Sequence, residues 1–399
     1  MCRLVKRLLC IILFITISAC NNSEVYPIST FGEDLEVINS VTSPVILKDG
    51  ERQIVVSSKF QGRIFTSTSQ GLGGTSYGWF NKNILLSDSV FVNRSKIGGE
   101  GRIWFGPDQG PNTIFFKINE KTGEKLHAAP KDLDTLPFNI LAQSSESVTL
   151  GSRLQIKNLQ GFHFNIEVER KIELLKENYV SNFLSNSFSN KLSYVAYKTD
   201  TKMTNIGKEN WSKESGLISL WDLGCYHPTP KTTVIIPLKG NPENATVYFT
   251  EIDSTRIVIR DNFLFYKADA NYLNKIGTLP ENTLPYFGSY SPELNSLTIV
   301  KFSFNSLDKE YVNAHPVHVK NQYTGDVINV FNDGKWGEVG PFGPFYELET
   351  SSPAKELKVG ESLSHFQEVY HFNASKKELN KITEQILGIS LLQVENALR

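Results

Sequence analysis

Short runs of β-branched and aromatic residues, separated by Gly, Asn, Asp and Pro, dominate the chain from Gln53 onward. Such runs are typical of β-strands bounded by turns. We predict strands at 54–57, 63–67, 113–118, 153–159, 164–174, 191–197, 216–223, 232–237, 246–251, 256–260, 262–267, 297–304, 326–331, 345–349 and 363–372. Strands alternating with helices, which would indicate a parallel sheet, are missing from the pattern. We therefore expect a large antiparallel all-β fold, in one domain over residues 30–399.

The predicted strand 164–174 shows the clearest alternation of apolar and polar positions. Phe164, Ile166 and Val168 are apolar, and the residues between them are polar. Successive side chains of a strand point to opposite faces of the sheet. One face of this strand is therefore expected in the core and the other in solvent.

Two segments carry helix signals. Thr30 and Glu33 form a capping box, in which each side chain can bond an otherwise unsatisfied backbone N–H, and this predicts a short helix through Ile38. Residues 375–392 begin with the same Ser-x-x-Glu signal and continue with apolar residues at helical spacing. We expect an amphipathic C-terminal helix there, packed on the sheets.

The N-terminal segment has the pattern of a signal peptide. Three basic residues precede an apolar run over 8–17, which is too short to cross the roughly 30 Å hydrocarbon core of a bilayer as a stable helix. We interpret residues 1–19 as the signal. Ala19 followed by Cys20 resembles the lipobox of bacterial lipoproteins, which implies cleavage before Cys20, acylation of Cys20 and a polar tether over 20–29. The alternative is an uncleaved signal anchor.

This interpretation places the protein in the bacterial cell envelope, at the outer membrane or facing the periplasm, with the lipid as its membrane contact. Loss of residues 1–19 leaves 38 of the 41 basic residues against 42 acidic ones, so the net charge moves from -1 to -4. No dense basic stripe is present, which argues against a nucleic-acid partner. Cys225 is then the one free cysteine, and an intramolecular disulfide is excluded.

The glycine-rich block 98–107 contains Arg102 and Trp104. Glycines allow a ligand to approach the backbone, a guanidinium donates several hydrogen bonds, and an indole offers an apolar face. Together these groups suit a sugar, which has both hydroxyl groups and a C–H face. The block lacks the spacing of a nucleotide-binding loop, and we expect no cofactor. A glycine-rich turn with a buried tryptophan is the alternative explanation.

Glu347 and Glu349 lie two residues apart on a predicted strand and should therefore share a face. In a pocket, burial and mutual repulsion would raise a carboxyl pKa toward the range that a general base needs. On an exposed face the pair would only be solvated. Farther upstream, Asp222 and His227 belong to a polar cluster at a strand end, where His227 could transfer protons.

Metal binding is not expected from the sequence. His315 and His318 could share one site, but two ligands without a third make a poor zinc site. Cys225 has no surrounding motif of a nucleophile, and no Gly-x-Ser-x-Gly elbow occurs.

Several motifs occur in order over most of residues 30–372. They are Gln61-Gly62-Arg63-Ile64, the block 98–107, Met203-Thr204-Asn205-Ile206-Gly207, Trp221-Asp222-Leu223-Gly224 and the segment 343–353, which contains Leu348-Glu349-Thr350. Together these motifs resemble an uncharacterised family of bacterial lipoproteins that is similar to the galactose mutarotase-like superfamily, which includes the aldose 1-epimerases.

The resemblance implies a β-supersandwich and a sugar site. In aldose epimerases, a glutamate in a Leu-Glu-Thr context removes the proton of the anomeric hydroxyl, and a histidine protonates the ring oxygen. Glu349 matches the glutamate. The histidine context has no match, so His227 or Asp222 is the candidate acid. Arg102 occupies the region of a second, substrate-binding histidine.

Two functions remain open from the sequence. One is a lipid-anchored protein that opens sugar rings as an aldose epimerase does, with Glu349 as the base. The other is a non-catalytic glycan-binding envelope lipoprotein. In both cases Arg102, Trp104, Glu347, Trp221 and Arg63 are the expected carbohydrate-binding residues. A purely structural envelope component is a third possibility, and it predicts that both glutamates face solvent.

Overall fold

The computed structural model describes residues 27–87, 97–119, 121–185, 192–249, 251–315 and 320–398. The predicted signal peptide, Cys20 and His318 lie outside these residues. Within the described ranges, none of the helices combines the length and the apolar character needed to cross a lipid bilayer.

Antiparallel β-sheets account for most of the regular secondary structure in the described chain, as predicted. The largest has ten strands in the order β14 (Ile257–Arg260), β15 (Phe263–Lys267), β12 (Thr233–Pro237), β17 (Tyr286–Ser291), β18 (Ser296–Phe302), β21 (Ser362–Asn373), β10 (Ser193–Asn205), β9 (His163–Leu174), β8 (Ser147–Lys157) and β7 (Asn139–Gln143). The second has six, in the order β13 (Thr246–Val247), β16 (Asn274–Thr278), β19 (Ile328–Asn332), β20 (Tyr346–Ser351), β11 (Ser219–Tyr226) and β4 (Arg102–Gly106).

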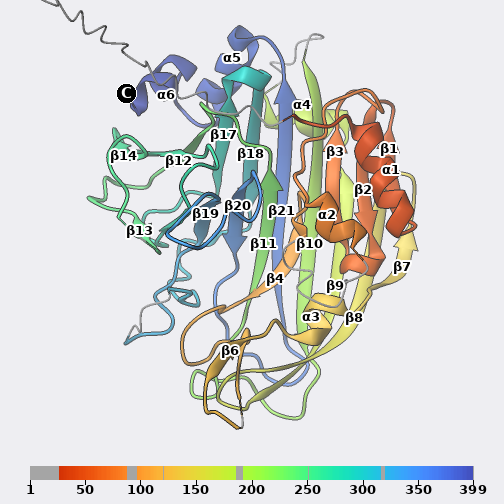
Figure 1. Ribbon diagram of the computed structural model, residues 1–399, viewed down its shortest axis with the longest axis vertical. Helices are drawn as coiled ribbons and strands as arrows, with labels where there is room; N and C mark the ends of the chain where they lie inside the picture. Colours follow the sequence, from red (N-terminus) through yellow and green to blue (C-terminus); the bar gives the residue numbers. More distant parts are fainter. Residues whose placement is uncertain are drawn as a thin grey trace, which may run out of the picture.

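Two smaller sheets complete the set. They are the three-stranded sheet β1 (Val45–Asp49), β2 (Arg52–Ser57) and β3 (Arg63–Thr68), and the hairpin β5 (Phe116–Ile118) and β6 (Lys125–His127). Backbone hydrogen bonds between Ile64 and Gly101, with N···O distances of 2.8 and 3.1 Å, join β3 to the start of β4. The three- and six-stranded sheets thereby form one layer opposite the ten-stranded sheet (Figure 1).

The main hydrophobic core lies between these layers. It contains Val56 of β2, Val168 of β9, Leu220 of β11 and Leu348 of β20, all at most 1% exposed. The predicted alternation in β9 is confirmed, because Phe164, Ile166 and Val168 are buried. The fully buried Arg170 continues the same inward-facing row and breaks its apolar pattern.

Arg170 is neutralised across the core by Asp222 of β11. Its Nη1 and Nη2 each donate to one oxygen of that carboxylate at 3.0 Å, and Nη1 also donates to Thr201 Oγ1 at 2.7 Å. Thr199 Oγ1 donates to Asp222 at 2.7 Å. This two-point geometry satisfies a charge that would otherwise be very costly to bury, and it ties the two sheets together.

The helices lie on the outside of the sheets. They are α1 (Phe31–Val41), α2 (Lys82–Leu86), α3 (Lys131–Thr135), α4 (Glu177–Phe183), α5 (Lys376–Ile386) and α6 (Leu391–Ala397). The capping box of α1 forms as predicted. A second hydrophobic cluster joins α4, α5 and α6 to the outer face of the ten-stranded sheet.

The single C-terminal helix expected over 375–392 is instead two helices, α5 and α6. Gly388 adopts φ +80, and its N–H bonds to the carbonyls of Thr383 and Glu384 at 3.1 Å. A left-handed glycine of this kind ends a helix. Ser390 then opens α6 with a capping box of its own. Helical spacing alone does not reveal such an interruption.

Strand prediction was least accurate where glycine or charge interrupts the apolar pattern. The segments 113–118 and 246–251 contain only the short strands β5 and β13. The unpredicted strands include β4 in the glycine-rich block and β16, which carries Lys275. Neighbouring strands supply hydrogen bonds that override these weak local preferences.

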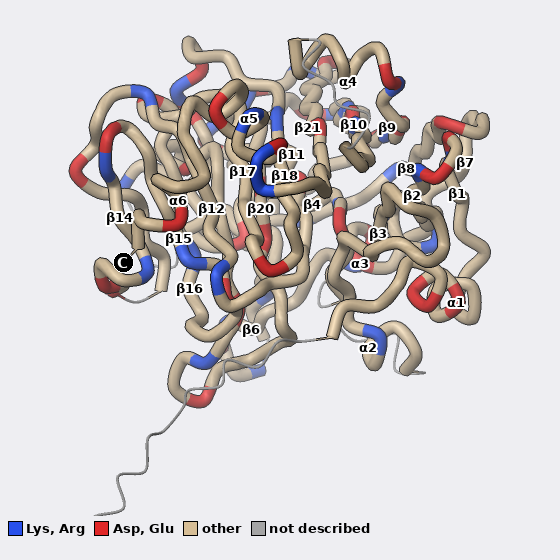
Figure 2. The backbone as a smooth tube through the Cα atoms, turned by 90° about the horizontal axis from the view of Figure 1, so that it is seen from above, with Lys and Arg blue, Asp and Glu red and all other residues tan. Residues whose placement is uncertain are grey.

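Charged positions of both signs are interspersed around the outside of the molecule (Figure 2). Many form exposed ion pairs, such as Arg153 with Glu167 on β8 and β9 and Lys381 with Glu378 on α5. Exposed pairs of this kind contribute at most about 1 kcal/mol each. Stability therefore depends mainly on the core and on its buried polar contacts.

Replacing the buried guanidinium tests the Arg170 contact. We expect Arg170→Met to lower the free energy of unfolding by about 3–5 kcal/mol, because Asp222 would keep a buried charge without its partner. Adding Asp222→Leu should recover much of the loss. Urea denaturation measures both, and Arg153→Met, in an exposed pair, is the control with a change under about 1 kcal/mol. Equal costs for the two arginines would contradict this role.

Candidate functional site

Glu347 and Glu349 point to the same face of β20, as their spacing predicted. In the ladder, Glu349 stands opposite Leu223 of β11 and Asn329 of β19, and Glu347 stands opposite Cys225 and Phe331. Directly opposed residues share a face. This face points away from the ten-stranded sheet, because the neighbouring Thr350 points the other way and bonds to His365 and Gln367 of β21 in that sheet.

Glu349 is 1% exposed and is held by two donors. Lys275 Nζ and Trp221 Nε1 each lie 3.0 Å from Glu349 Oε2. Within the described chain, Oε1 has no hydrogen-bond donor. Burial raises the pKa of Glu349 to about 7, although the charge of Lys275 opposes the shift. The carboxyl group can therefore exchange a proton near neutral pH, and it does not face solvent as the structural hypothesis required.

Lys275 of β16 lies at the centre of the site. Its ammonium sits 4.2 Å from the ring centre of Trp221 and 5.2 Å from that of Tyr248, positions that favour cation–π attraction. Its charge also acts on the nearby carboxyl groups of Asp108 and Asp326. One ammonium is thus shared electrostatically by three carboxyl groups.

Asp326 and Asp108 differ in their hydrogen bonding. Tyr248 and Thr246 donate to the carboxylate of Asp326 at 2.6 and 2.9 Å, and burial raises its pKa to about 6. Burial also raises the pKa of Asp108, just after β4, and Lys275 opposes that shift. Asp108 Oδ1 is shielded from solvent and has no hydrogen-bond partner among the described residues. A protonated Asp108 could therefore donate to a ligand.

Glu347 forms a second charged group beside Glu349. Arg102 Nη2 donates to Glu347 Oε1 at 3.2 Å, and the thiol of Cys225 approaches the same oxygen at 3.0 Å. Burial and the charge of Glu347 raise the pKa of the Cys225 thiol, so it stays protonated. The Arg102 guanidinium lies 5.1 Å from the ring centre of Trp104, which stacks on Phe115.

Arg63 and two glycines of the glycine-rich block order the loop that leads to Arg102. Arg63 of β3 is 3% exposed and donates to the carbonyl oxygen of Gly98, so it orders the loop before β4. Gly98 and Gly99 adopt φ of +82 and +111, conformations that favour glycine. Arg63 thus contacts the backbone next to the site. Its role in binding a ligand stays a prediction.

The structure does not bring the two predicted acids to Glu349. Asp222 points to the opposite face of β11, where Arg170 binds it. His227 lies four residues beyond Leu223, the cross-strand neighbour of Glu349, which is roughly 13 Å along a strand. Burial lowers the pKa of His227 to about 4, so it is neutral at physiological pH. Neither residue can oppose Glu349 across a small ligand.

An aromatic rim borders the site on the side of Glu347. Phe331 stacks near Phe345 at 5.6 Å and meets Phe249 edge-on at 6.5 Å, and Phe249 stacks on Trp336 at 6.2 Å. Trp336 is 45% exposed. The backbone N–H groups of residues 342 and 343 bond to Asp333 and fix the loop that carries Trp336. The exposed indole of Trp336 suits the C–H face of a sugar.

The described residues contain no group of three or more His, Cys, Asp or Glu side chains arranged to hold a metal ion. His315 Nε2 is 3.0 Å from the carbonyl oxygen of Val247 and packs beside Tyr248. His318, the other histidine considered for a metal site, is not among the described residues.

The sequence did not single out Lys275, Tyr248, Asp108 or Asp326. One feature of the sequence points to Lys275 as a strand residue. It precedes an apolar residue in the short polar stretch Asn274-Lys275-Ile276-Gly277. Treated as a strand, that stretch would place Lys275 and Ile276 on opposite faces. Asp108 and Asp326 lie in connections between strands, and sequence spacing does not indicate where connections converge.

Removing Lys275 should produce a pH-dependent loss of stability. The folded-state pKa of Glu349 lies above the unfolded value of about 4.3, so stability falls as pH rises between these values. Lys275→Met should raise the folded pKa further. We expect a cost of about 3–5 kcal/mol at pH 9 and about 1 kcal/mol at pH 5, measured by urea denaturation.

Lys381→Met, which breaks an exposed pair with Glu378, is the matched control and should cost under about 1 kcal/mol at both pH values. A cost for Lys275→Met that does not change between pH 5 and pH 9 would contradict the proposed ionisation of Glu349.

Comparison with solved structures found proteins of similar architecture. An Escherichia coli K12 protein, whose description as an aldose 1-epimerase is itself provisional, has 11% identity and a TM-score of 0.48, with coverage of 82% of this chain and 98% of that one. A galactose mutarotase-like protein from Lactobacillus casei ATCC 334 has 9% identity and a TM-score of 0.49, with coverage of 82% and 100%. Likeness at this level assigns no role to any residue here.

No curated protein matches the sequence. A family model does match, and it covers nearly all of the described chain, residues 29–398. The chain therefore belongs to the family of unknown function DUF6786.

Proposed function

We propose that this protein binds a carbohydrate on the outward face of the six-stranded sheet and transfers protons on it, as an aldose epimerase does. The observation that carries the proposal is Glu349, a buried carboxyl group in the Leu-Glu-Thr context, with a pKa near neutrality and a second oxygen without a donor among the described residues. Strongly shifted carboxyl groups beside specific charged partners are typical of functional sites.

In the proposed reaction, Glu349 Oε1 takes the proton from the anomeric hydroxyl of a pyranose. The ring oxygen receives a proton from an acid, the bond between the anomeric carbon and the ring oxygen breaks, and an open-chain aldehyde forms. Ring closure on the other face returns both protons. Lys275 and Trp221 hold Oε2 and thereby fix the direction of Oε1.

Asp108 is our choice for the acid. Its raised pKa favours the protonated form, and its Oδ1 has no partner among the described residues. The charge of Lys275 acts on both Asp108 and Glu349, and the charge of Asp108 raises the pKa of Glu349. A pair of carboxyl groups held in different protonation states can serve as acid and base. Asp222 and His227 lie outside this arrangement.

The second candidate function is glycan binding without catalysis. One observation favours it specifically: Glu349 is 1% exposed, so a sugar reaches Oε1 only if the covering side chains move. Trp336, on the exposed rim, is accessible without such movement. A binding protein would use the rim together with Arg102 and Trp104, and the Glu349–Lys275 pair would serve only to hold the strands.

NMR measurement of anomeric exchange in a panel of free aldoses tests the first function. We expect the protein to accelerate exchange, with a rate that rises as pH increases through about 7 because Glu349 then loses its proton. Glu349→Gln should reduce the acceleration by about 10²–10⁴. Asp108→Asn should reduce it similarly while leaving sugar binding in place. The control is Glu384→Gln, which changes an exposed glutamate on α5.

Exchange that Glu349→Gln leaves unchanged would refute the catalytic function. Sugar binding without any acceleration, lost in Trp336→Ala but kept in Glu349→Gln, would instead establish the glycan-binding function. Loss of exchange in Glu349→Gln but not in Asp108→Asn would retain the base and reject our choice of acid.

We further propose that the protein is anchored in the bacterial envelope through acylated Cys20, as the basic and apolar segment before Ala19-Cys20 suggests. Expressed in a bacterial host with radiolabelled palmitate, the natural chain should incorporate label and fractionate with membranes. Cys20→Ser should not incorporate label, should not fractionate with membranes and should keep the mass of the uncleaved precursor. Cys10→Ser, within the signal, is the control. An unlabelled natural chain would refute the anchor.

A further inference from the structure

A cavity of about 300 Å³ lies between α6 and the ends of β12, β15 and β17, in the region of the second hydrophobic cluster. It is separate from the Glu349 site, because its lining includes none of Glu349, Lys275 and Trp221. Small-molecule sites in proteins have volumes of about 300 Å³ or more. We propose that this cavity is a binding site for a small hydroxylated carboxylate, of the sugar-acid class.

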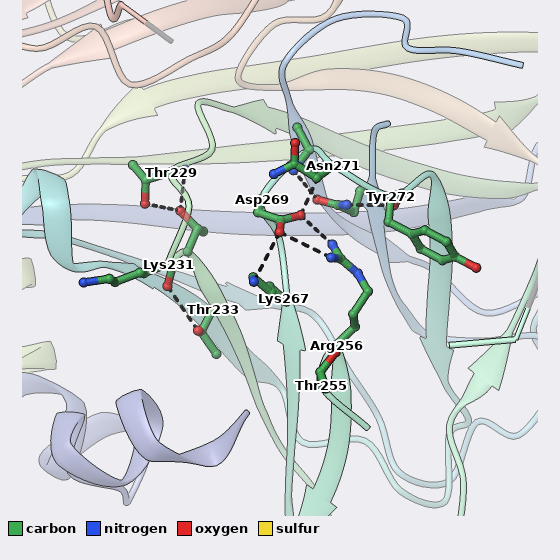
Figure 3. Close-up of polar contacts among 12 residues, drawn as sticks. Thr229, Lys231, Thr233, Thr255, Arg256, Lys267, Asp269, Asn271 and Tyr272 are labelled. Atoms are coloured by element: carbon green, nitrogen blue, oxygen red, sulfur yellow. Dashed lines mark hydrogen bonds and ion pairs between the residues drawn. The ribbon is translucent and has the colours of Figure 1, made fainter. Parts of the chain in front are cut away.

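Two lysines give the cavity its charge preference. Lys231 is exposed and has no ion-pair partner among the described residues. Lys267 Nζ is 3.5 Å from Asp269, but that carboxylate is already held by Arg256 and by the N–H of Asn271. Lys267 is turned toward this group, whereas Lys231 extends away from it (Figure 3). Lys231 therefore offers an ammonium that a ligand carboxylate can neutralise.

The remaining lining suits the body of a sugar acid. Tyr290, Val394 and Leu398 offer apolar surface for a C–H face. Thr233 Oγ1 donates to the carbonyl oxygen of Lys231 at 3.2 Å and can accept a hydrogen bond from a ligand hydroxyl. Glu395 also lines the cavity, and its carboxylate is paired with Lys376 at 2.6 Å. A glutamate held in this way accepts hydrogen bonds from ligand hydroxyls while its charge is balanced. The combination favours one negative charge on a ring that carries hydroxyl groups.

The break of the C-terminal segment into two helices places α6 at the wall of the cavity. Gly388 redirects the chain after α5, and α6 then returns over β12 and β17. One continuous helix would carry Val394 and Glu395 away from these strands. The interruption thus builds one wall of the proposed site.

Isothermal titration of the full chain with D-glucuronate tests the proposal. We expect binding that weakens with added salt and that Lys231→Met weakens by about tenfold or more. Lys267→Met should weaken it less, because Lys267 is shared with Asp269. Glu349→Gln should leave it unchanged, which separates this site from the proposed catalytic one. Lys377→Met, which changes an exposed lysine on α5 outside the cavity, is the control. Melting curves check that each variant folds.

Three competitors distinguish the ligand class. D-Glucose lacks the charge, acetate lacks the ring, and inorganic phosphate carries a different anion, so each should bind at least tenfold more weakly than D-glucuronate at this site. Equal affinity of D-glucuronate for Lys231→Met and for the natural chain would overturn the site. Equal or tighter binding of phosphate or acetate would overturn the sugar-acid class. Loss of binding in Glu349→Gln would show that D-glucuronate binds at the Glu349 site instead, and it would also overturn the proposal.

Discussion

The register between β11 and β20 is the constraint on which the rest of the structure depends. Trp221, Glu347 and Glu349 lie on the outward face of the six-stranded sheet, and Asp222 lies on the inward face. A shift of one residue would exchange these faces, burying Glu349 between the sheets and moving Asp222 away from Arg170. The contact between Arg170 and Asp222 therefore fixes both the packing of the two sheets and the position of the candidate site.

The two buried ion pairs on these faces differ in how fully their atoms are bonded. Both oxygens of Asp222 accept hydrogen bonds inside the core, so neither is left for a ligand. In Glu349, both donors contact Oε2. The first arrangement is what a structural contact requires. The second leaves an oxygen for a ligand, and together with the raised pKa it distinguishes a candidate functional group from a structural one.

Carboxyl groups outnumber cations around Lys275, because connections between strands place two aspartates near it. Asp108 follows β4 and Asp326 precedes β19, so chain segments far apart in the sequence deliver acids to one ammonium. Burial is the largest cause of the raised pKa values of Glu349, Asp108 and Asp326, and the charge of Asp108 adds to the shift of Glu349. The pKa values of Glu349 and Asp326, about 7 and about 6, therefore lie above those of isolated carboxyl groups. The aromatic rim near Trp336 gives the same region a surface for an apolar ligand face.

The sequence by itself determined the antiparallel all-β class, the alternation in β9, the cap of α1 and the shared face of Glu347 and Glu349, because these follow from local periodicity and local hydrogen bonding. The sequence also singled out Arg102, Trp104 and Trp221, which lie near Glu347 and Glu349 in the structure. Only the tertiary structure decided which side chains meet. Lys275 pairs with Glu349 across strands that the sequence does not show as neighbours, and Asp222 is taken by Arg170 of the opposite sheet. Contacts between distant segments depend on register and packing, which no local pattern specifies.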